Sequence, residues 1–329
     1  MAFQVVLSRV INLLRVISGY FFSLITGRVI HWGKPLAISI EPNNTCNLRC
    51  PECPSGMKEL TRSRGNMDPY TFYSIIDQLS PYLSYLTLYF QGEPYISPSF
   101  FEFIRYARSK RIFVSSSTNG HFLDGKSVQQ TIQSGLNRLI ISLDGADQES
   151  YSTYRVGGNL NKVLEGIRLL VNEKRRLKSK FPKVILQCLV LRSNEHELQE
   201  IKKLGKTLGV DKVTFKTAQF NDFQYGNPLM PENPKYSRYT FKLTTSPPLY
   251  RVKSAQPNSC FRMWSGCVFT WDGKVVPCCF DKDAIHILGD INKEPFAEIW
   301  KSETYKTFRA TILKHRKSIE ICNNCDQTF

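Results

Sequence analysis

Three cysteines lie within eight residues near the start of the chain, at Cys46, Cys50 and Cys53. The spacing C-x3-C-x2-C is too close for a disulfide framework and too regular for unrelated buried thiols. Thiolates are soft ligands, and three of them on one short loop can hold one face of an iron–sulfur cluster. A four-iron cube has four corners, so three cysteines leave one iron open to bind a small molecule and pass it an electron. A structural zinc loop is the alternative that this spacing leaves open.

The triplet resembles the cysteine loop of the radical S-adenosylmethionine (SAM) superfamily. The resemblance implies a [4Fe-4S] cluster on Cys46, Cys50 and Cys53, with SAM bound to the open iron. It implies further that the cluster cleaves SAM reductively to a 5′-deoxyadenosyl radical, which abstracts a substrate hydrogen. One position departs from the family, because Glu52 stands before the third cysteine, where an aromatic residue is common.

Three later segments resemble SAM-binding segments of the same family, and each follows a predicted strand. They are Gln91-Gly92-Glu93-Pro94, similar to GGEP, Ser115-Ser116-Ser117-Thr118-Asn119-Gly120, similar to TNG, and Ser142-Leu143-Asp144-Gly145, which matches SLDG. Each alone would be an ordinary turn, since these residue types favour turns, but their order along the chain favours a site. The resemblance implies SAM contacts from Gly92, Glu93, Ser116, Asn119 and Ser142. It places Asp144 near the reacting centre and makes Gln187 and Asn194 weaker candidates.

Short apolar runs alternate with helical patterns over residues 36–218. The runs predict six strands, at residues 36–40, 86–90, 112–116, 139–143, 184–191 and 212–216. The intervening helices begin with the N-cap pair Asp68-Pro69 and then cover residues 99–109, 126–134, 159–180 and 195–208. Repeated strand–helix units predict an α/β fold, a partial (β/α)6 barrel of parallel strands. Functional residues are expected at the carboxyl ends of the strands, where the cysteine triplet lies.

A second group of cysteines lies near the end of the chain. Cys260, Gly273 and Cys278 fit the pattern C-x(9–15)-G-x4-C, which resembles the opening of the SPASM/twitch extension of some radical SAM enzymes. Asp272-Gly273 predicts a hairpin turn that brings the first two thiols together. The resemblance implies one auxiliary [4Fe-4S] cluster in a small C-terminal Cys-rich α+β domain, residues 260–329, behind a connector at 219–259. The predicted ligands are Cys260, Cys278, Cys322 and Cys325, with Cys267 and Cys279 as alternates and a four-cysteine zinc site as the other interpretation.

The N-terminal segment, residues 1–35, is predicted to form an amphipathic helix. Polar residues recur every three or four positions as a narrow stripe, at Gln4, Ser8, Asn12, Arg15, Gly19, Ser23 and Thr26. Only twelve uncharged residues separate Arg15 from Arg28, which predicts a helix that does not span a bilayer. The helix could instead dock on the main domain, but its exposed bulk and three arginines favour a membrane interface.

Charge and cysteine content limit the kinds of partner and the cellular location that the sequence suggests. A net charge of +16 over 329 residues suits anionic partners, including an anionic membrane surface. The basic runs contain no interleaved aromatic residues, which argues against nucleic acid. Nine of the ten cysteines fall in the two groups, a pattern typical of metal binding in a reducing compartment. We therefore expect a cytoplasmic protein, peripheral to the inner face of the membrane.

These features predict a radical SAM oxidoreductase or maturase that draws electrons from a flavodoxin or ferredoxin. The family resemblance allows a peptide or protein side chain, or a sugar, cyclitol or lipid-linked small molecule, as substrate. Residues 1–35 are too short for a leader-binding domain, which favours substrates other than leader-guided peptides. The rival interpretation is a non-catalytic zinc-binding structural or interaction protein. No catalytic base is predicted.

Overall fold

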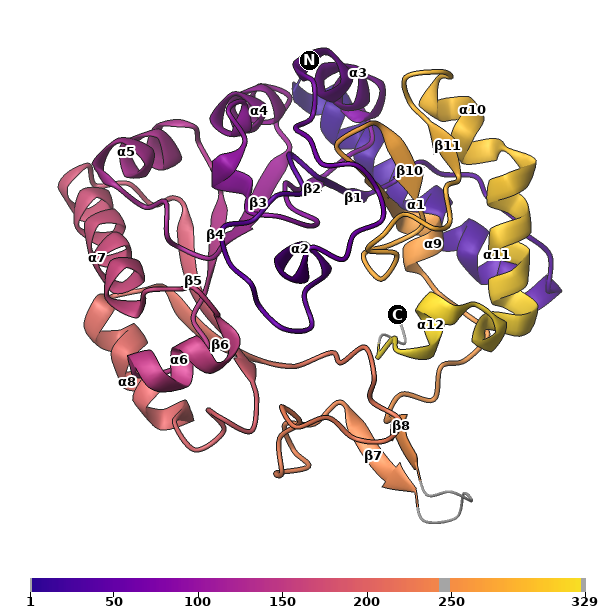
Figure 1. The fold of residues 1–329 in the computed structure, drawn as a ribbon. Helices are drawn as coiled ribbons and strands as arrows, with labels where there is room; N and C mark the ends of the chain where they lie inside the picture. The colour runs from indigo at the N-terminus through magenta and orange to yellow at the C-terminus, as the bar shows by residue number, and fades with distance from the viewer. Residues whose placement is uncertain (1, 243–248, 327–329) are drawn as a thin grey trace.

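A curved sheet of nine strands forms the centre of the protein (Figure 1). The computed structural model describes residues 2–242 and 249–326. Six of the strands are parallel neighbours in chain order and confirm the predicted partial barrel. They are β1 (Ala37–Ile40), β2 (Tyr85–Thr87), β3 (Phe113–Thr118), β4 (Arg138–Ser142), β5 (Lys183–Val190) and β6 (Lys212–Thr217).

Helices cover the outer face of the six-stranded part, as Figure 1 shows. They are α3 (Pro69–Leu79), α4 (Phe100–Ser109), α5 (Gly125–Gln133), α7 (Leu160–Arg176) and α8 (Leu198–Leu208). The Asp68 carboxylate accepts a hydrogen bond from the Thr71 amide, so the predicted N-cap of α3 is confirmed. Stacked rings of Phe72 and Phe103, 4.2 Å apart, join α3 to α4 in the apolar core.

The loops at the carboxyl ends of the strands carry three short helical turns. These are α2 (Pro54–Met57), η1 (Pro94–Ile96) and α6 (Gln148–Tyr154). The sequence predicted none of the three. Each turn lies in or next to a segment singled out as a candidate site, so the site loops are ordered by local hydrogen bonds.

The C-terminal region extends the barrel sheet. The predicted hairpin forms from β9 (Gly266–Phe269) and β10 (Lys274–Val276), and its turn uses Gly273 at φ +83°. Strand β9 pairs in parallel with β1, with Ile38 opposite Cys267. Strand β11 (Gly289–Asp290) completes the sheet. The helices of this region are α9 (Arg262–Ser265), α10 (Phe296–Lys301), α11 (Glu303–His315), η2 (Arg316–Ser318) and α12 (Glu320–Asn323).

The connector at residues 219–259 contains a two-stranded antiparallel sheet that the sequence did not predict. Strand β7 (Tyr239–Lys242) pairs with β8 (Leu249–Val252) beneath the barrel in Figure 1. Proline and asparagine residues flank both strands, so the short alternation of apolar and polar residues is not recognisable as a strand pattern. The connector is thus a partly structured element beside the barrel.

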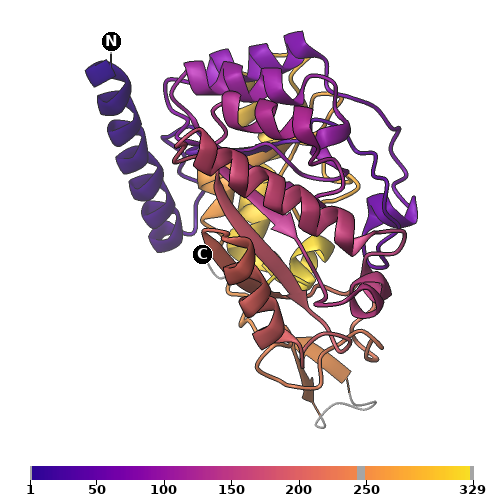
Figure 2. The ribbon, with the colours of Figure 1, turned by 90° about the vertical axis from the view of Figure 1, so that its left-hand side faces the viewer.

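Helix α1 (Ala2–Thr26) lies apart from the barrel as a separate layer (Figure 2). Only part of its polar stripe faces the protein: Asn12, Gly19 and Ser23 are buried, whereas Gln4, Arg15 and Thr26 are exposed. Asn12 exchanges hydrogen bonds with the backbone of Lys34, at 2.8 and 3.0 Å. Ser23 does the same with Ile30, both at 2.9 Å. The polar stripe therefore attaches α1 to the segment that leads into β1.

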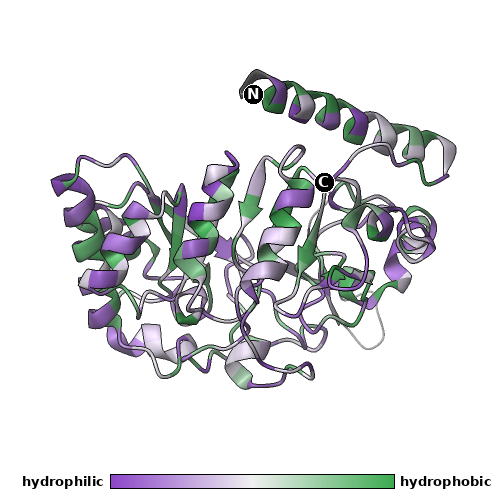
Figure 3. Cartoon of the chain, turned by 90° about the horizontal axis from the view of Figure 1, so that it is seen from above, coloured by the Kyte–Doolittle hydropathy of each residue, from purple (hydrophilic) through white to green (hydrophobic). Residues whose placement is uncertain are grey.

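The opposite side of α1 is apolar and exposed, and Figure 3 shows the many apolar residues along the helix. Residues 4–26 are long and apolar enough to cross a membrane by length and composition alone. This differs from the expectation based on charge spacing, because Arg15 is the second of only two charged residues in that stretch. In the structure α1 instead packs through Asn12 and Ser23 on residues 30–34, and the Tyr20 ring lies 5.3 Å from that of Trp264 in α9.

Candidate catalytic and auxiliary cluster sites

The cysteine triplet lies on the loop that follows β1, at the carboxyl end of the barrel strands. Cys50 is buried, and Cys46 and Cys53 are half-buried beside it. Gly56, in α2, packs directly on this loop: a Cβ there would lie 2.8 Å from the Cys50 amide nitrogen. Only glycine permits this approach, so α2 holds the loop in its compact form.

Polar groups are directed at the triplet's sulfur atoms. The Leu48 amide donates to Cys46 Sγ at 3.5 Å, and the Asn119 side-chain amide lies 3.7 Å from the same sulfur. An Arg155 guanidinium nitrogen lies 3.8 Å from Cys50 Sγ. Burial raises the pKa of the Cys50 thiol to about 11, and the nearby Arg155 charge opposes this rise. N–H donors at buried sulfurs fit thiolates that bind an electron-rich iron–sulfur centre.

The triplet's geometry differs from a single-ion site. Zinc would need its ligands around one ion, at about 2.3 Å from each sulfur. Among residues 2–242 and 249–326, no three cysteine, histidine or carboxylate side chains converge in that way. The cysteines of a cubane cluster each bind a different iron, so such a cluster does not need its three thiols gathered around one ion.

Glu93 is the buried carboxylate of the site, with 2% of its surface exposed. Its oxygens accept hydrogen bonds from the Asn119 amide at 2.7 Å and the Thr118 hydroxyl at 2.8 Å. Burial raises its pKa to about 7, although these hydrogen bonds lower it. The residue thus joins the loop after β2 to the end of β3 and the loop that follows it.

Gly92 adopts φ +75°, and a Cβ there would lie 2.7 Å from the Thr45 carbonyl oxygen. A side chain at position 92 would therefore collide with the cysteine loop, which explains why glycine is present there. The Gly92 amide also donates to Ser55 Oγ at 3.1 Å. Gln91, where the family commonly has glycine, accepts a 3.3 Å hydrogen bond from the same Ser55 hydroxyl.

The remaining predicted SAM contacts lie on different sides of the sheet. Asn119 lies at the triplet, where its side chain donates to Asn47 at 2.7 Å. Ser142 is half-buried at the end of β4, with its side chain toward the barrel interior. Ser116 lies on the outer side with Val114 and donates to the Leu88 carbonyl at 2.7 Å. The structure therefore does not bring Ser116 to the interior.

Asp144 and the weaker candidate Asn194 form a buried support. Asp144 is fully buried and accepts from the Leu189 amide at 2.7 Å and from Arg155 Nε at 2.5 Å. Asn194 is also fully buried and donates to the carbonyls of Asp144 and Leu189. Gln187, opposite Ser142 on β5, is half-buried. Asn194 therefore stabilises the loop after β4 in this structure.

Arg155 is a site residue that the sequence analysis missed. It follows α6 and connects the buried Asp144 carboxylate to the Cys50 sulfur. Asp144 raises the pKa of this guanidinium, whereas burial lowers it, and the net pKa lies well above its ordinary value. Arg155 lies eleven residues after Asp144. No motif or local residue pattern marks this position, so the sequence could not identify it.

The four predicted auxiliary ligands line one pocket in the C-terminal region. Cys260, Cys278, Cys322 and Cys325 share its wall with Arg262 and Arg316. A terminal nitrogen of the buried Arg316 lies 3.3 Å from Cys325 Sγ. Burial raises the pKa of Cys322 to about 11, and the Arg316 charge lowers it. The donor set therefore suits a cluster held by four thiolates.

The two alternate ligands do not line this pocket. Cys267 is buried in β9, in the main apolar core. Cys279 packs against a small cluster of Phe90, Val268 and Val276, and accepts from Arg262 at 3.2 Å. The placement favours the original choice of four ligands.

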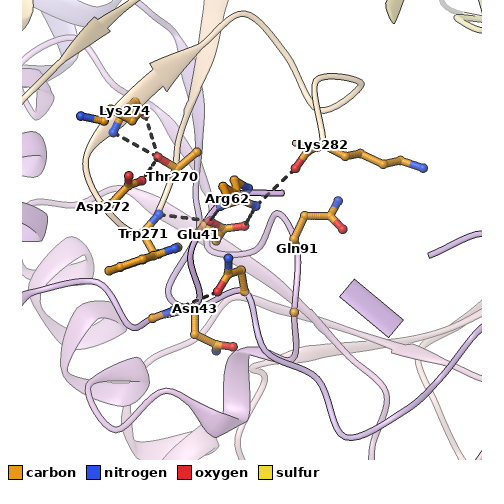
Figure 4. A network of polar contacts seen from close by, with 12 residues as sticks. Glu41, Asn43, Arg62, Gln91, Thr270, Trp271, Asp272, Lys274 and Lys282 are labelled. Carbon is orange, nitrogen blue, oxygen red and sulfur yellow. Dashed lines mark hydrogen bonds and ion pairs between the residues drawn. The ribbon is translucent and has the colours of Figure 1, made fainter. Parts of the chain in front are cut away.

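A buried ion pair joins the triplet's neighbourhood to the C-terminal region (Figure 4). Arg62 donates two hydrogen bonds to Glu41, at 2.5 and 2.6 Å, and a third to the Lys282 carbonyl at 3.3 Å. The Glu41 carboxylate also accepts from the Trp271 amide at 3.1 Å. Asn43, in the same view, donates to the Glu93 carbonyl at 2.8 Å. The hairpin of β9 and β10 is therefore fastened to the loop that carries the cysteines.

Comparison with protein families decides the assignment. Residues 40–205, half of the chain, match the family described as the radical SAM superfamily. The chain belongs to the radical SAM superfamily. Residues 260–326 match the SPASM family, described as an iron-sulfur cluster-binding domain. The rival interpretation of a non-catalytic zinc protein is therefore wrong.

Curated relatives of this radical SAM enzyme have varied activities. A tungsten-containing aldehyde ferredoxin oxidoreductase cofactor-modifying protein of Pyrococcus furiosus is 25% identical over 297 residues, 82% of each chain. The PqqA peptide cyclase of Gluconobacter oxydans is 24% identical, over 89% of this chain and 83% of the relative. An S-adenosyl-L-methionine-dependent 2-deoxy-scyllo-inosamine dehydrogenase of Niallia circulans is 22% identical, over 88% and 92%.

Solved structures share the fold of this radical SAM enzyme. Streptococcus suis SuiB bound to S-adenosylmethionine aligns with a TM-score of 0.66 and 13% identity, over 93% of this chain and 75% of SuiB. BtrN in complex with AdoMet and 2-DOIA aligns with a TM-score of 0.53 and 19% identity, over 90% and 94%. At these identities the likeness shows the fold alone.

Family membership confirms the cofactors: a SAM-bound [4Fe-4S] cluster and auxiliary iron–sulfur binding in the C-terminal region. It does not test individual ligands or SAM contacts. Those assignments, and the four domain boundaries, remain predictions.

Proposed function

We propose that this radical SAM enzyme oxidises or otherwise modifies a peptide or protein side chain. The main support is that a three-thiol loop and a four-thiol pocket are held on one continuous sheet. When bound, the catalytic cluster and SAM supply reductive cleavage of SAM and removal of a hydrogen from the substrate. The chain's own residues hold these groups in place and exclude water from them.

The proposed roles follow from the donor and acceptor chemistry of each side chain. Cys46, Cys50 and Cys53 supply the cluster thiolates. Glu93 offers a buried carboxylate to the SAM ammonium, which needs an acceptor when it leaves water. Asn119 and Arg155 donate N–H groups to cysteine sulfurs. Gly92 and Ser142 line the same end of the barrel.

Glu93→Gln is expected to weaken SAM binding by about tenfold to a hundredfold, because it removes the negative partner of the ammonium. In the unaltered enzyme, affinity is expected to fall as pH drops below about 7, since protonation of Glu93 removes the same charge. Equilibrium dialysis of the reconstituted enzyme over a pH series measures both effects. A variant with unchanged affinity, or one that keeps the full pH dependence, would contradict the role.

Cys260, Cys278, Cys322 and Cys325 are proposed to hold the auxiliary cluster. A cluster with four protein thiolates has no open iron, so it would carry electrons and not bind substrate.

Arg316→Gln is expected to lower the reduction potential of the auxiliary cluster, because the buried positive charge beside Cys325 favours the more negative reduced state. An EPR-monitored redox titration measures the potential. Arg316→Lys keeps the charge and should shift it less, and the exposed neighbour variant Lys317→Gln is the matched control. An equal potential in Arg316→Gln and Lys317→Gln would rule out this charge effect.

Two relatives support a peptide substrate. The PqqA peptide cyclase aligns over most of this chain, and the SuiB fold, also solved with its precursor peptide SuiA, aligns with a TM-score of 0.65. The inosamine dehydrogenase and BtrN support a sugar or cyclitol as the second candidate.

Substrate fractions of a producing-cell extract separate these two candidates. The reconstituted enzyme is incubated with SAM, dithionite and either the peptide fraction or the small-molecule fraction. We expect the peptide fraction to raise 5′-deoxyadenosine above the substrate-free level and to yield a peptide of altered mass. Stimulation by the small-molecule fraction alone would favour the cyclitol class instead.

We further propose a cytoplasmic location at the inner face of the membrane, reached through α1, and a flavodoxin or ferredoxin as electron donor. The exposed apolar side of α1 supports the first point, and the charge of +16 suits an acidic electron-transfer protein. The proposed organisation remains an N-terminal segment (1–35), barrel (36–218), connector (219–259) and auxiliary-cluster region (260–329).

A further inference from the structure

Helix α1 has the reverse of the usual orientation for a helix on a water-soluble protein. Its buried positions include the polar residues Asn12 and Ser23, which bond to the backbone of residues 30–34. Large apolar side chains point to solvent, with 59% of Leu14, 57% of Phe21 and 78% of Ile25 exposed. An apolar surface along most of a 25-residue helix requires an apolar partner.

The position of α1 on the barrel is fixed by Arg9. Its guanidinium donates to the carbonyls of Ser80, Lys110 and Arg111, at 2.8 to 3.1 Å. Ser80 follows α3, and Lys110 and Arg111 lie between α4 and β3, so this part of α1 lies at the amino ends of the barrel strands. We call this end, with the turns that lead into β3, β5 and β6, the strand-start face. Figures 1 and 2 place α1 and the α2 loop on opposite sides of the sheet.

The strand-start face is strongly basic. Helices of a barrel end where the next strand begins, so the turns after α4, α7 and α8 all lie on it. Its acidic residues Asp77, Glu173 and Asp211 each form an ion pair with a lysine or arginine. Six further exposed cations have no ion pair with a described acidic residue: Arg111, Arg175, Lys178, Lys180, Lys206 and Lys212.

The charge around α1 has the same sign. No acidic residue precedes Glu41, and Arg15 and Arg28 are exposed beside the apolar side chains. An apolar helix bordered by cations complements an anionic bilayer, in which acyl chains lie below phosphate groups. A protein partner would need an apolar groove with an acidic border of matching length.

We propose that α1 and the strand-start face together bind an anionic lipid bilayer, with the cysteine loop turned away from it. The substrate then reaches the site from the aqueous side, which favours a water-soluble peptide over a lipid-embedded molecule. This orientation rests on the membrane placement proposed above, and it adds which face is bound and where the site opens.

Lysine footprinting on the full reconstituted enzyme tests the orientation without a substitution. Exposed lysines are acetylated with and without vesicles of phosphatidylcholine and phosphatidylglycerol, and the labels are mapped by mass spectrometry. We expect vesicles to protect Lys178 and Lys180 and to leave Lys126 and Lys162, at the opposite end of the barrel, fully reactive. Protection of Lys126 and Lys162 instead would overturn the orientation.

Two matched charge reversals test the same point by vesicle flotation. Lys178→Glu with Lys180→Glu should reduce binding to the anionic vesicles by at least about tenfold. Lys126→Glu with Lys162→Glu makes the same charge change at the other end and should leave binding unchanged. Equal losses in the two pairs would mean that only net charge matters and would overturn the proposal.

The apolar side of α1 is tested by Leu14→Gln with Ile25→Gln, compared with the exposed control Ile285→Gln. The α1 pair should abolish flotation, and the control should not. If the unaltered enzyme does not float and instead forms a dimer that the α1 substitutions dissociate, the partner of α1 is a second copy of the chain. That result would overturn the proposal of a bilayer. Formation of 5′-deoxyadenosine in solution is read in parallel, so loss of flotation with intact SAM cleavage refutes this inference and not the enzyme's chemistry.

Discussion

Cys46→Ala is expected to abolish formation of 5′-deoxyadenosine from SAM and dithionite. We propose that three thiolates hold the catalytic cube, and the Cys46 sulfur receives N–H donors from Leu48 and Asn119. Without this ligand a second iron loses its protein attachment, and we expect the cube to be lost. Iron should then fall from about eight to about four per reconstituted chain, if both sites hold four-iron clusters. Iron and sulfide assays and chromatography of the nucleoside products measure the two effects.

Cys188→Ala is the matched control for Cys46→Ala. Cys188 is a fully buried thiol in β5, inside the apolar core, and no cluster role is assigned to it. This variant should keep its iron and its SAM cleavage, with at most a loss of stability from the smaller side chain. An unchanged yield of 5′-deoxyadenosine in Cys46→Ala would refute the ligand assignment.

Arg62→Ala is expected to destabilise the folded enzyme by about 3–5 kcal/mol, because it leaves the fully buried Glu41 carboxylate without its cation. Burial already raises the pKa of Glu41, and the two Arg62 hydrogen bonds oppose that rise. The thermal unfolding midpoint under anaerobic conditions should fall by roughly 10 °C. The loop from Glu41 to Cys53 should also become more accessible, so chelators should remove iron faster.

Two controls distinguish the loss of the buried ion pair from the effect of removing one positive charge. Lys306→Ala removes one partner of an exposed pair with Glu303 and should change stability by less than about 1 kcal/mol. Glu41→Gln combined with Arg62→Met removes both buried charges and should recover much of the lost stability. If Arg62→Ala and Lys306→Ala lower the midpoint equally, the ion pair does not stabilise the enzyme as proposed.

The barrel and its cofactor chemistry could be predicted from local sequence signals. Strands such as residues 184–191 are marked by an apolar run that is interrupted at Gln187, and Asp68 is marked as an N-cap by the proline that follows it. The cysteine spacings and the turn at Asp272-Gly273 are equally local. Such signals need no knowledge of distant contacts, which explains their reliability here.

Features that depend on distant contacts could not be predicted. Nothing near β9 indicates that it pairs with β1, more than two hundred residues earlier in the chain. Arg155 becomes a site residue only because α6 places it beside Cys50. Ser116 was assigned by motif order, but the alternation of β3 turns its hydroxyl to the outer side, toward Leu88. The stripe on α1 was visible in the sequence, although which side would pack was set by residues 30–34.

The parallel pairing of β9 with β1 gives the auxiliary region a mechanical role. Strand β1 pairs with β2 on one side and with β9 on the other, and both pairings fix its register. A fragment lacking the C-terminal region would expose β1 as a bare edge, and such edges invite aggregation. A continuous hydrogen-bonded ladder from β1 through β9 to β10 therefore fixes the strand that precedes Cys278 relative to the strand that precedes the Cys46–Cys53 loop.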